Sequence, residues 1–308
     1  MKRKKLTASM IALVMSVSLP MTTYAANWYL EDGSVTVNTD NSGQTVTQGG
    51  GSAVPDEAPV ITQRGSSAET SNTITINASE NATANVTISN VNIGTSSAAI
   101  ATSGKGNVNI ELDGTNTLKS GRYHAGLEKS QDGKLTITDE NANGKLIATG
   151  GDYGAGIGGD DQGNGKNITI TGGEVTAAGG GNGAGIGGGL RKEGEKITVS
   201  GDATLKVQGG LTDEWDGAGA GIGNGGSHNG DFSGSFTPVN GAETEPDTSN
   251  LTTGKIEYYA PGADMTKDEP TSTTFGSLVQ PEPSSPGETG APVEYRMQTS
   301  ASEPVQGN

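Results

Sequence analysis

Short stretches of alternating apolar and polar residues recur along the middle of this 308-residue chain. Each stretch places two apolar side chains around one polar residue, as in Val86–Ile88, Val108–Ile110, Leu135–Ile137, Ile168–Ile170 and Ile197–Val199. Alternation with a period of two puts the apolar side chains on one face of a β-strand. The pattern therefore predicts strands with one buried face, and the chain beyond its N-terminal segment shows no sustained helical period.

The alternating stretches belong to a longer repeat. The sequence GAGIGG at Gly183–Gly188 also occurs at Gly154–Gly159, 29 residues earlier, and aligning 144–160 with 173–189 gives 10 identities in 17 positions. Weaker copies extend the series, so that equivalent apolar anchors stand at Ile100, Leu127, Ile157, Ile186 and Ile222. Repeats of about 20 to 50 residues are typical of solenoids and related arrays.

Three short strands per repeat predict an all-β, right-handed parallel β-helix. A second alternating strand follows the first in each repeat, as at Val175 and Ala177, and the Ala-Gly-Ile element forms the third. Equivalent residues of successive coils would then lie about 4.8 Å apart. The expected inward-facing ladders are Val108, Leu135, Ile168 and Ile197, and Leu127, Ile157, Ile186 and Ile222. A β-sandwich is the alternative architecture, but it would lack so regular a period.

The N-terminal segment has the features of a secretion signal. Lys2 to Lys5 form a basic start, and an apolar stretch too short to span a bilayer as a mature helix follows it. We therefore expect a signal peptide at 1–25, with a retained membrane anchor as the alternative. Residues 26–60 are expected to form capping strands, because repeat arrays need ends that resist edge-to-edge association.

The C-terminal segment differs from the repeats in composition. The stretch 60–237 contains no proline, whereas 238–308 is rich in Pro, Ser, Thr and Glu. Such a composition buries too little apolar surface to offset chain entropy. The predicted repeat domain is therefore 61–237, and the predicted tail, 238–308, is mostly disordered, with 251–260 as its one candidate strand.

Composition and charge exclude several classes of protein. Lys and Arg number 19 against 35 Asp and Glu, a net charge of -16, so nucleic acid is not an expected partner. Gly contributes 51 residues and aromatic residues only 4%, which argues against a compact core of large side chains. Because there is no cysteine, disulfides and thiolate chemistry are excluded. We expect an exported monomer with no membrane span after signal cleavage.

Several phrases of the repeat domain carry a family resemblance. They are NVTISNVNI at 85–93, NVNIELDGTNTLKSG at 107–121, KLIATGGDYGAGIGG at 145–159 and KNITITGGEVTAAGG at 166–180, with the opening WYLEDGSVTV at 28–37. This wording and its order resemble secreted bacterial proteins that carry a β-helical carbohydrate-binding domain. The resemblance covers about 28–236 and implies a non-catalytic, extracellular role in polysaccharide binding. It carries no defined binding residues onto this chain.

Two tyrosines occupy equivalent places in neighbouring repeats. Tyr123 and Tyr153 each lie four residues before their anchor, so we expect their rings to stack at a surface corner. Exposed aromatic rings can stack on the apolar face of a sugar. Neighbouring polar side chains could bond its hydroxyls or a uronate carboxylate. The candidate carbohydrate-binding residues are therefore Tyr123, Tyr153, Trp215, Arg122, His124 and Asp152. An aromatic ladder that only stiffens the corner is the alternative.

An acidic turn is the candidate metal site. Asp160 and Asp161 lie between two coils, and the equivalent turns carry Glu128 and Glu193. Stacked turns would gather these carboxylates along one edge, and hard oxygen ligands suit Ca²⁺. Calcium is therefore the one cofactor considered. The alternative is a solvated acidic edge that keeps the protein soluble.

The sequence favours binding over catalysis. Gly154–Gly159 matches GxGxxG, but no helix follows, as a dinucleotide site would require. A pectin-active enzyme needs several carboxylates with a basic residue or histidine on one face, and the two histidines lie in Gly-rich turns. We expect a secreted, non-enzymatic module that binds polysaccharide or a cell-surface glycan. A structural or adhesive surface protein with a protein partner is the second interpretation, and a pectin-active lyase or hydrolase is the third.

Overall fold

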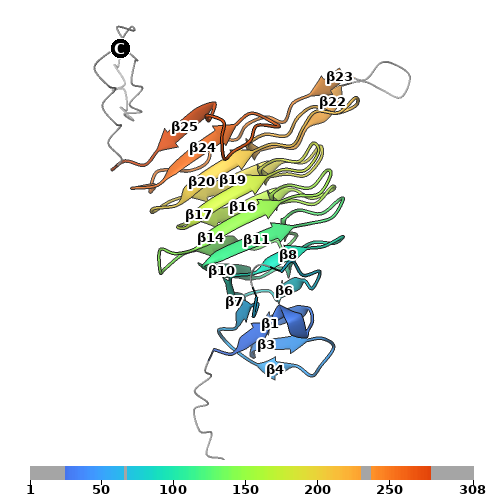
Figure 1. Cartoon of the computed structure of the whole chain (residues 1–308), viewed down its shortest axis with the longest axis vertical. Helices are drawn as coiled ribbons and strands as arrows, with labels where there is room; N and C mark the ends of the chain where they lie inside the picture. The colour runs from blue at the N-terminus through green and yellow to red at the C-terminus, as the bar shows by residue number, and fades with distance from the viewer. Residues whose placement is uncertain (1–24, 66–67, 230–236, 279–308) are drawn as a thin grey trace, which may run out of the picture.

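The computed structural model describes residues 25–65, 68–229 and 237–278. They form an all-β parallel solenoid of about six turns, whose strands stack along the long axis (Figure 1). The one helical element in these ranges is a single 3-10 turn, η1 (Leu30–Asp32). The predicted fold class is confirmed. The signal peptide expected at 1–25 lies, except for Ala25, outside the described residues, as does everything after residue 278.

Three sheets run along the solenoid, and each coil adds one strand to each sheet. Sheet A holds β1 (Asn27–Tyr29), β5 (Val60–Thr62), β7 (Thr83–Ser89), β10 (Asn107–Asp113), β13 (Leu135–Thr138), β16 (Gly165–Ile170) and β19 (Gly194–Val199). Sheet C holds β8 (Asn92–Gly94), β11 (Thr115–Lys119), β14 (Lys145–Thr149), β17 (Glu174–Ala178), β20 (Thr204–Gln208), β24 (Lys255–Tyr259) and β25 (Ser272–Phe275). Sheet B holds β2 (Val35–Asp40), β3 (Gly43–Gln48), β4 (Val54–Pro55), β6 (Ile74–Ala78), β9 (Ile100–Gly104), β12 (Leu127–Lys129), β15 (Ile157–Gly158), β18 (Ile186–Gly187) and β21 (Ile222–Gly223). A small antiparallel pair, β22 (Ser227–Asn229) and β23 (Thr237–Val239), stands apart from them.

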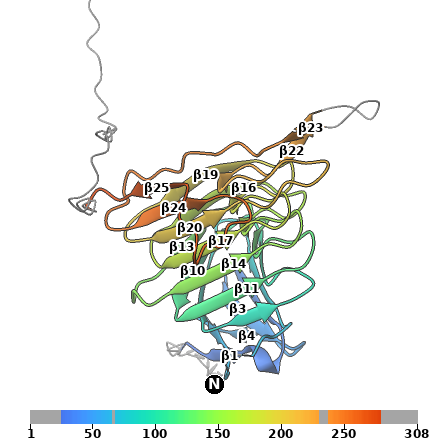
Figure 2. The same ribbon diagram turned by 45° about the horizontal axis from the view of Figure 1, so that its top comes forward.

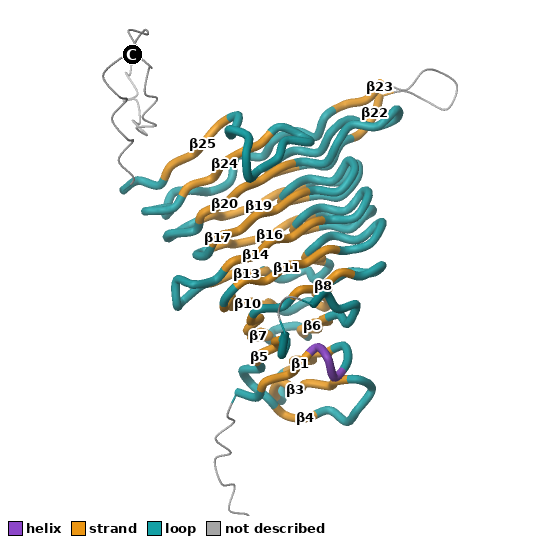
Figure 3. Tube along the Cα trace, in the orientation of Figure 1, coloured by secondary structure: helices purple, strands orange, loops and turns teal. Residues whose placement is uncertain are grey.

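The predicted inward ladders form the core. Sheet A pairs Val108 with Leu135, Leu135 with Ile168 and Ile168 with Ile197. Sheet B aligns its own anchors in the same way, and the side chains of both ladders are buried. Each buried aliphatic side chain contributes about 1.5–3 kcal/mol, so the stacked coils stabilise one another. The loops of successive coils stack as well, on one side of the solenoid (Figures 2 and 3).

Glycine in the GAGIGG corners is required by close packing between coils. Gly158 has φ +137°, and a Cβ there would lie 2.1 Å from the carbonyl oxygen of Gly187 in the next coil. Gly187 repeats the arrangement against Gly223. A side chain at either position would push the coils apart, which explains why the motif recurs with the repeat.

The N-terminal coil closes one end of the solenoid. The β2–β3 hairpin is antiparallel, and β4 pairs antiparallel with β3 at the end of sheet B. The indole N–H of Trp28 donates to a carboxylate oxygen of Asp56 at 2.8 Å, which links β1 to the segment that directly follows β4. These short, non-parallel strands leave little regular edge for another chain to extend.

The solenoid continues past the boundary predicted at residue 237. Strand β24 pairs in parallel with β20, so that Leu205 faces Ile256 and Val207 faces Tyr258. Leu251 and Ile256 are buried in the core. The candidate strand at 251–260 is present as β24, but the proline-rich composition did not indicate a further coil, because its apolar residues are few and widely spaced. Only the residues after 278 remain as a candidate tail.

Candidate functional site

The two tyrosines meet at the corner between sheets C and B. Their ring centroids are 5.8 Å apart and their planes differ by 25°. The Tyr123 N–H donates to the carbonyl oxygen of Asp152 at 2.8 Å, which ties the two coils together beside the rings. Tyr123 is 46% exposed. The predicted stacking of the two tyrosine rings from neighbouring coils is therefore confirmed, and the ring pair lies at the surface.

Both tyrosines hold a backbone conformation that L-residues rarely adopt. φ is 75° at Tyr123 and 74° at Tyr153, whereas the equivalent residue of the next corner, Asn182, does not adopt a positive φ. For a bulky residue such a conformation costs about 1–3 kcal/mol. Glycine would remove that cost, yet both corners carry tyrosine. Strain retained in this way is a feature of binding and catalytic sites.

Arg122 lies alongside the tyrosine stack. Its guanidinium carbon is 4.7 Å from the Tyr123 centroid and 5.4 Å from the Tyr153 centroid. Because the centroids themselves are 5.8 Å apart, the guanidinium stands beside both rings rather than beyond either one. It donates to the Tyr153 hydroxyl at 3.5 Å and lies 3.9 Å from a carboxylate oxygen of Asp152. Two effects raise the pKa of Arg122: first the hydrogen bond to Tyr153, and then the charge effect of Tyr123.

His124 is held by a carboxylate at the edge of the same corner. Its Nδ1 is 2.8 Å from Oε2 of Glu128, and the Glu128 side chain is mostly buried. Burial raises the pKa of Glu128, and the hydrogen bond with His124 opposes that rise. Asp160 adds to the rise through like-charge repulsion. Sequence reasoning had not paired these two residues, although their i,i+4 spacing was visible.

Asp160 and Asp161, the predicted calcium ligands, lie in a turn that packs against Tyr123. The Asp161 N–H donates to the Tyr123 carbonyl oxygen at 2.9 Å. Both carboxylates accept hydrogen bonds from Gln162 within their own turn, at 3.1 Å each. In the described ranges, no group of three or more acidic or histidine side chains is arranged to hold a metal ion. The Asp161 hydrogen bond places this turn beside the backbone of Tyr123.

Trp215 lies farther along the axis, in the loop between β20 and β21, and is 51% exposed. The next residue, Asp216, anchors this loop: Arg191 donates to both its carboxylate oxygens, at 2.8 and 2.6 Å. Nδ1 of His228 lies 2.9 Å from the same carboxylate. Burial acts to raise the pKa of Asp216, but these partners lower it overall. Sequence reasoning missed this anchor, whose only signal was an insertion that lengthens one repeat.

A continuous set of contacts links Tyr153 to this loop. Leu190 donates its N–H to the Tyr153 carbonyl oxygen at 2.8 Å, and Arg191 follows it in sequence. The structure thus unites Tyr123, Tyr153, Arg122 and Asp152 at one corner and places Trp215 beyond them. The flat tyrosine rings, the guanidinium of Arg122 and the nearby carboxylates can together bind a ligand that has apolar faces and many hydroxyl groups.

Comparison with protein-family models, curated proteins and solved structures finds no match for this chain. Over the described ranges, no helix has the length and apolar character needed to cross a membrane.

Proposed function

We propose that this protein is a secreted, non-catalytic β-solenoid that binds a polysaccharide or a cell-surface glycan at the Tyr123–Tyr153 corner. The observation that carries the proposal is a stacked tyrosine pair, with Tyr123 exposed and Tyr153 half-buried, kept in a strained backbone conformation. A ladder that only stiffened the coil would gain more from glycine, which adopts a positive φ without strain.

The corner suits a sugar for three reasons. The rings offer apolar surface, Arg122 offers fixed donors, and Asp152 offers an acceptor beside them. The site is open rather than a deep cavity, so each sugar makes few contacts and its affinity is modest. Several coils stacked along one axis would let an extended glycan meet successive corners.

Affinity electrophoresis of residues 26–308 in gels that contain a panel of polysaccharides tests the proposal. We expect retardation by at least one polysaccharide, and we expect Tyr123→Ala/Tyr153→Ala to weaken that binding at least tenfold, about 1.4 kcal/mol. Tyr29→Ala is the matched control, because Tyr29 also has an arginine, Arg64, over its ring but lies in the first coil. Equal loss in control and double variant would place binding elsewhere.

A hydrolase is a second candidate, favoured by one observation. Glu128 is a largely buried carboxyl whose pKa is raised, it is paired with His124, and it lies near the tyrosine corner and Asp160. A carboxyl of this kind can act as a general acid while a second carboxylate stays ionised. A reducing-end assay on every polysaccharide that binds distinguishes the two functions: product formation abolished by Glu128→Gln establishes hydrolysis, and binding without product establishes the non-catalytic function.

A further inference from the structure

In sheet C, the inward-facing side chains of the last strand, β25, are polar, whereas those of the strands before it are mostly apolar. Leu205 is followed by Ile256 and then by Thr274, and the neighbouring ladder runs from Val207 to Tyr258 to Ser272. From β14 to β20 the steps of these ladders are apolar: Leu146, Val175 and Leu205 in one, and Ala148, Ala177 and Val207 in the other. The C-terminal end of the solenoid therefore presents hydroxyl groups and one tyrosine where a further coil would need apolar side chains.

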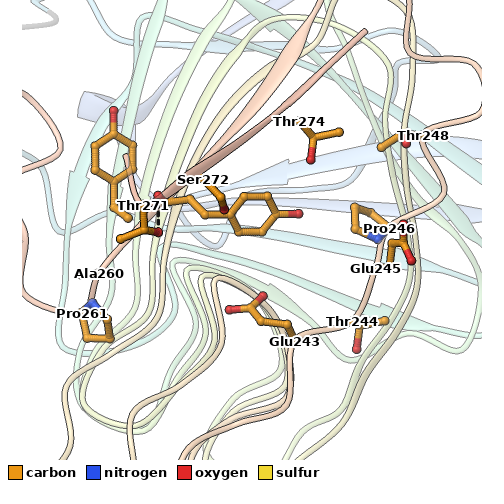
Figure 4. Close-up of a pocket in the computed structure, with 12 residues that line it drawn as sticks. Glu243, Thr244, Glu245, Pro246, Thr248, Ala260, Pro261, Thr271, Ser272 and Thr274 are labelled. Carbon is orange, nitrogen blue, oxygen red and sulfur yellow. Dashed lines mark hydrogen bonds between the residues drawn. The ribbon is translucent and has the colours of Figure 1, made fainter. Parts of the chain in front are cut away.

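A pocket of about 670 Å³ opens at this end, a volume within the range of small-molecule sites. The lining groups that Figure 4 labels come from three segments: 243–248, 260–261 and 271–274. Tyr258 and Tyr259 complete the lining, which therefore combines the inward ring of Tyr258 and two prolines with five Ser or Thr hydroxyls. Hydroxyls and flat apolar surfaces in one concave site suit a saccharide.

The charge of the pocket is negative. Glu243 and Glu245 both line it, and among the described lining residues none is cationic. The carboxylate of Glu243 accepts the N–H groups of Gly221 and Ile222, at 2.7 and 3.1 Å, so its position is fixed at the end of sheet B. Burial raises the pKa of Tyr258, and both glutamates raise it further, which shows that the tyrosine hydroxyl lies within their field.

We name the pocket lined by 243–248, 258–261 and 271–274 the C-terminal mouth. We propose that it is a second ligand site, separate from the tyrosine corner, that binds a glycan unit with a free, protonated amine. The ring of Tyr258 and the hydroxyls contact the sugar, and the carboxylates of Glu243 and Glu245 attract the ammonium group. An N-acetylated sugar of the same shape lacks the charge and gains no attraction to those carboxylates, so it binds more weakly. The site depends on charge complementarity, whereas the corner depends on stacking.

Calorimetric titration of residues 26–308 with a glucosamine trimer and with its fully N-acetylated counterpart tests this site at a pH where the amine is protonated. We expect the free amine form to bind at least tenfold more tightly. Glu245→Gln should weaken its binding at least fivefold. Tyr258→Phe, which keeps the core contact and removes the hydroxyl, should weaken it by a smaller factor.

Two controls separate this site from general attraction to an acidic protein and from the corner. Glu80→Gln removes an equal charge from an exposed turn far from the mouth, so affinity should be unchanged. Tyr123→Ala disables the corner and should also leave trimer binding unchanged. Equal affinity for the two trimers, absence of binding at millimolar concentration, or equal loss in Glu80→Gln and Glu245→Gln would overturn the proposal.

Discussion

The ring of Tyr123 stacks on the ring of Tyr153 while both residues hold φ near +75°. The stack gains about 0.5–1.5 kcal/mol from the aromatic pair, whereas the backbone loses about 1–3 kcal/mol at each tyrosine. The corner is therefore a net cost to folding, because stacking of the rings does not recover the backbone strain at both tyrosines.

Tyr123→Gly should be more stable than Tyr123→Ala by about 1 kcal/mol, because glycine adopts positive φ without strain and alanine does not. Urea unfolding followed by circular dichroism measures the difference. Both variants lose the ring, so both should lose glycan binding to the same extent. Alanine and glycine variants of equal stability would show that the backbone at this corner is not strained.

Arg122→Lys should weaken glycan binding several-fold although the charge is kept. The planar guanidinium lies beside both rings and bonds the Tyr153 hydroxyl, and an ammonium group cannot keep those contacts together. Because Arg122 is exposed, the free energy of unfolding should change by less than about 0.5 kcal/mol. Affinity electrophoresis and thermal melting give the two readouts, and full retention of affinity would remove Arg122 from the site.

Chelation should leave the melting temperature unchanged. The carboxylates of Asp160 and Asp161 already accept hydrogen bonds from Gln162 inside their own turn. Melting curves with and without EDTA, for the parent and for Asp160→Asn/Asp161→Asn, test this. A chelator-induced drop that disappears in the double variant would instead establish the calcium site that the sequence suggested.

Stability should rise with pH between about 8 and 10.5 because of Lys129. This lysine faces inward opposite Thr102 and is 5% exposed, and burial lowers its pKa from 10.5 to about 8. Within that window the unfolded chain binds a proton that the folded chain does not, so folding becomes more favourable as pH rises. Below pH 8 the folded protein bears the cost of a buried charge.

Lys129→Met should remove this rise and stabilise the protein at pH 7.5 by an amount on the order of 2 kcal/mol. Urea unfolding at pH 7.5 and pH 10 measures both effects. Lys134→Met, an exposed lysine at the entry to β13, is the matched control and should keep the parent's pH dependence. A parent protein whose stability is flat across the window would contradict the burial of an amine in the core.

Removal of residues 237–308 should destabilise the fold, whereas removal of 279–308 should not. The first truncation exposes the edge of β20 and removes Leu251 and Ile256 from the core, a loss of about 3 kcal/mol or more. Thermal melts of the two truncated chains make the comparison. Equal melting temperatures would mean that the last coil contributes nothing, as the composition alone predicts.

Most of the solenoid could be derived from the sequence, because its determinants are local and repeated. Alternation marked the strands, and the spacing of anchors such as Ile157 and Ile186 fixed which residues pair between coils. The tyrosine stack followed from the same period, since two residues at one place in adjoining coils must lie about one strand spacing apart.

Only the tertiary structure decided the features that depend on loops and on the ends. The position of Arg122 beside both rings, the pairing of Asp216 with Arg191 and the inward side chain of Lys129 depend on how turns of unequal length fold back between coils. In the last coil the sequence indicated only the strand within 251–260, and its place in the solenoid and the mouth were not predicted, for a related reason. A terminal coil must satisfy solvent on one side, so its inward residues, Thr274 and Ser272, no longer follow the apolar pattern by which the others are recognised.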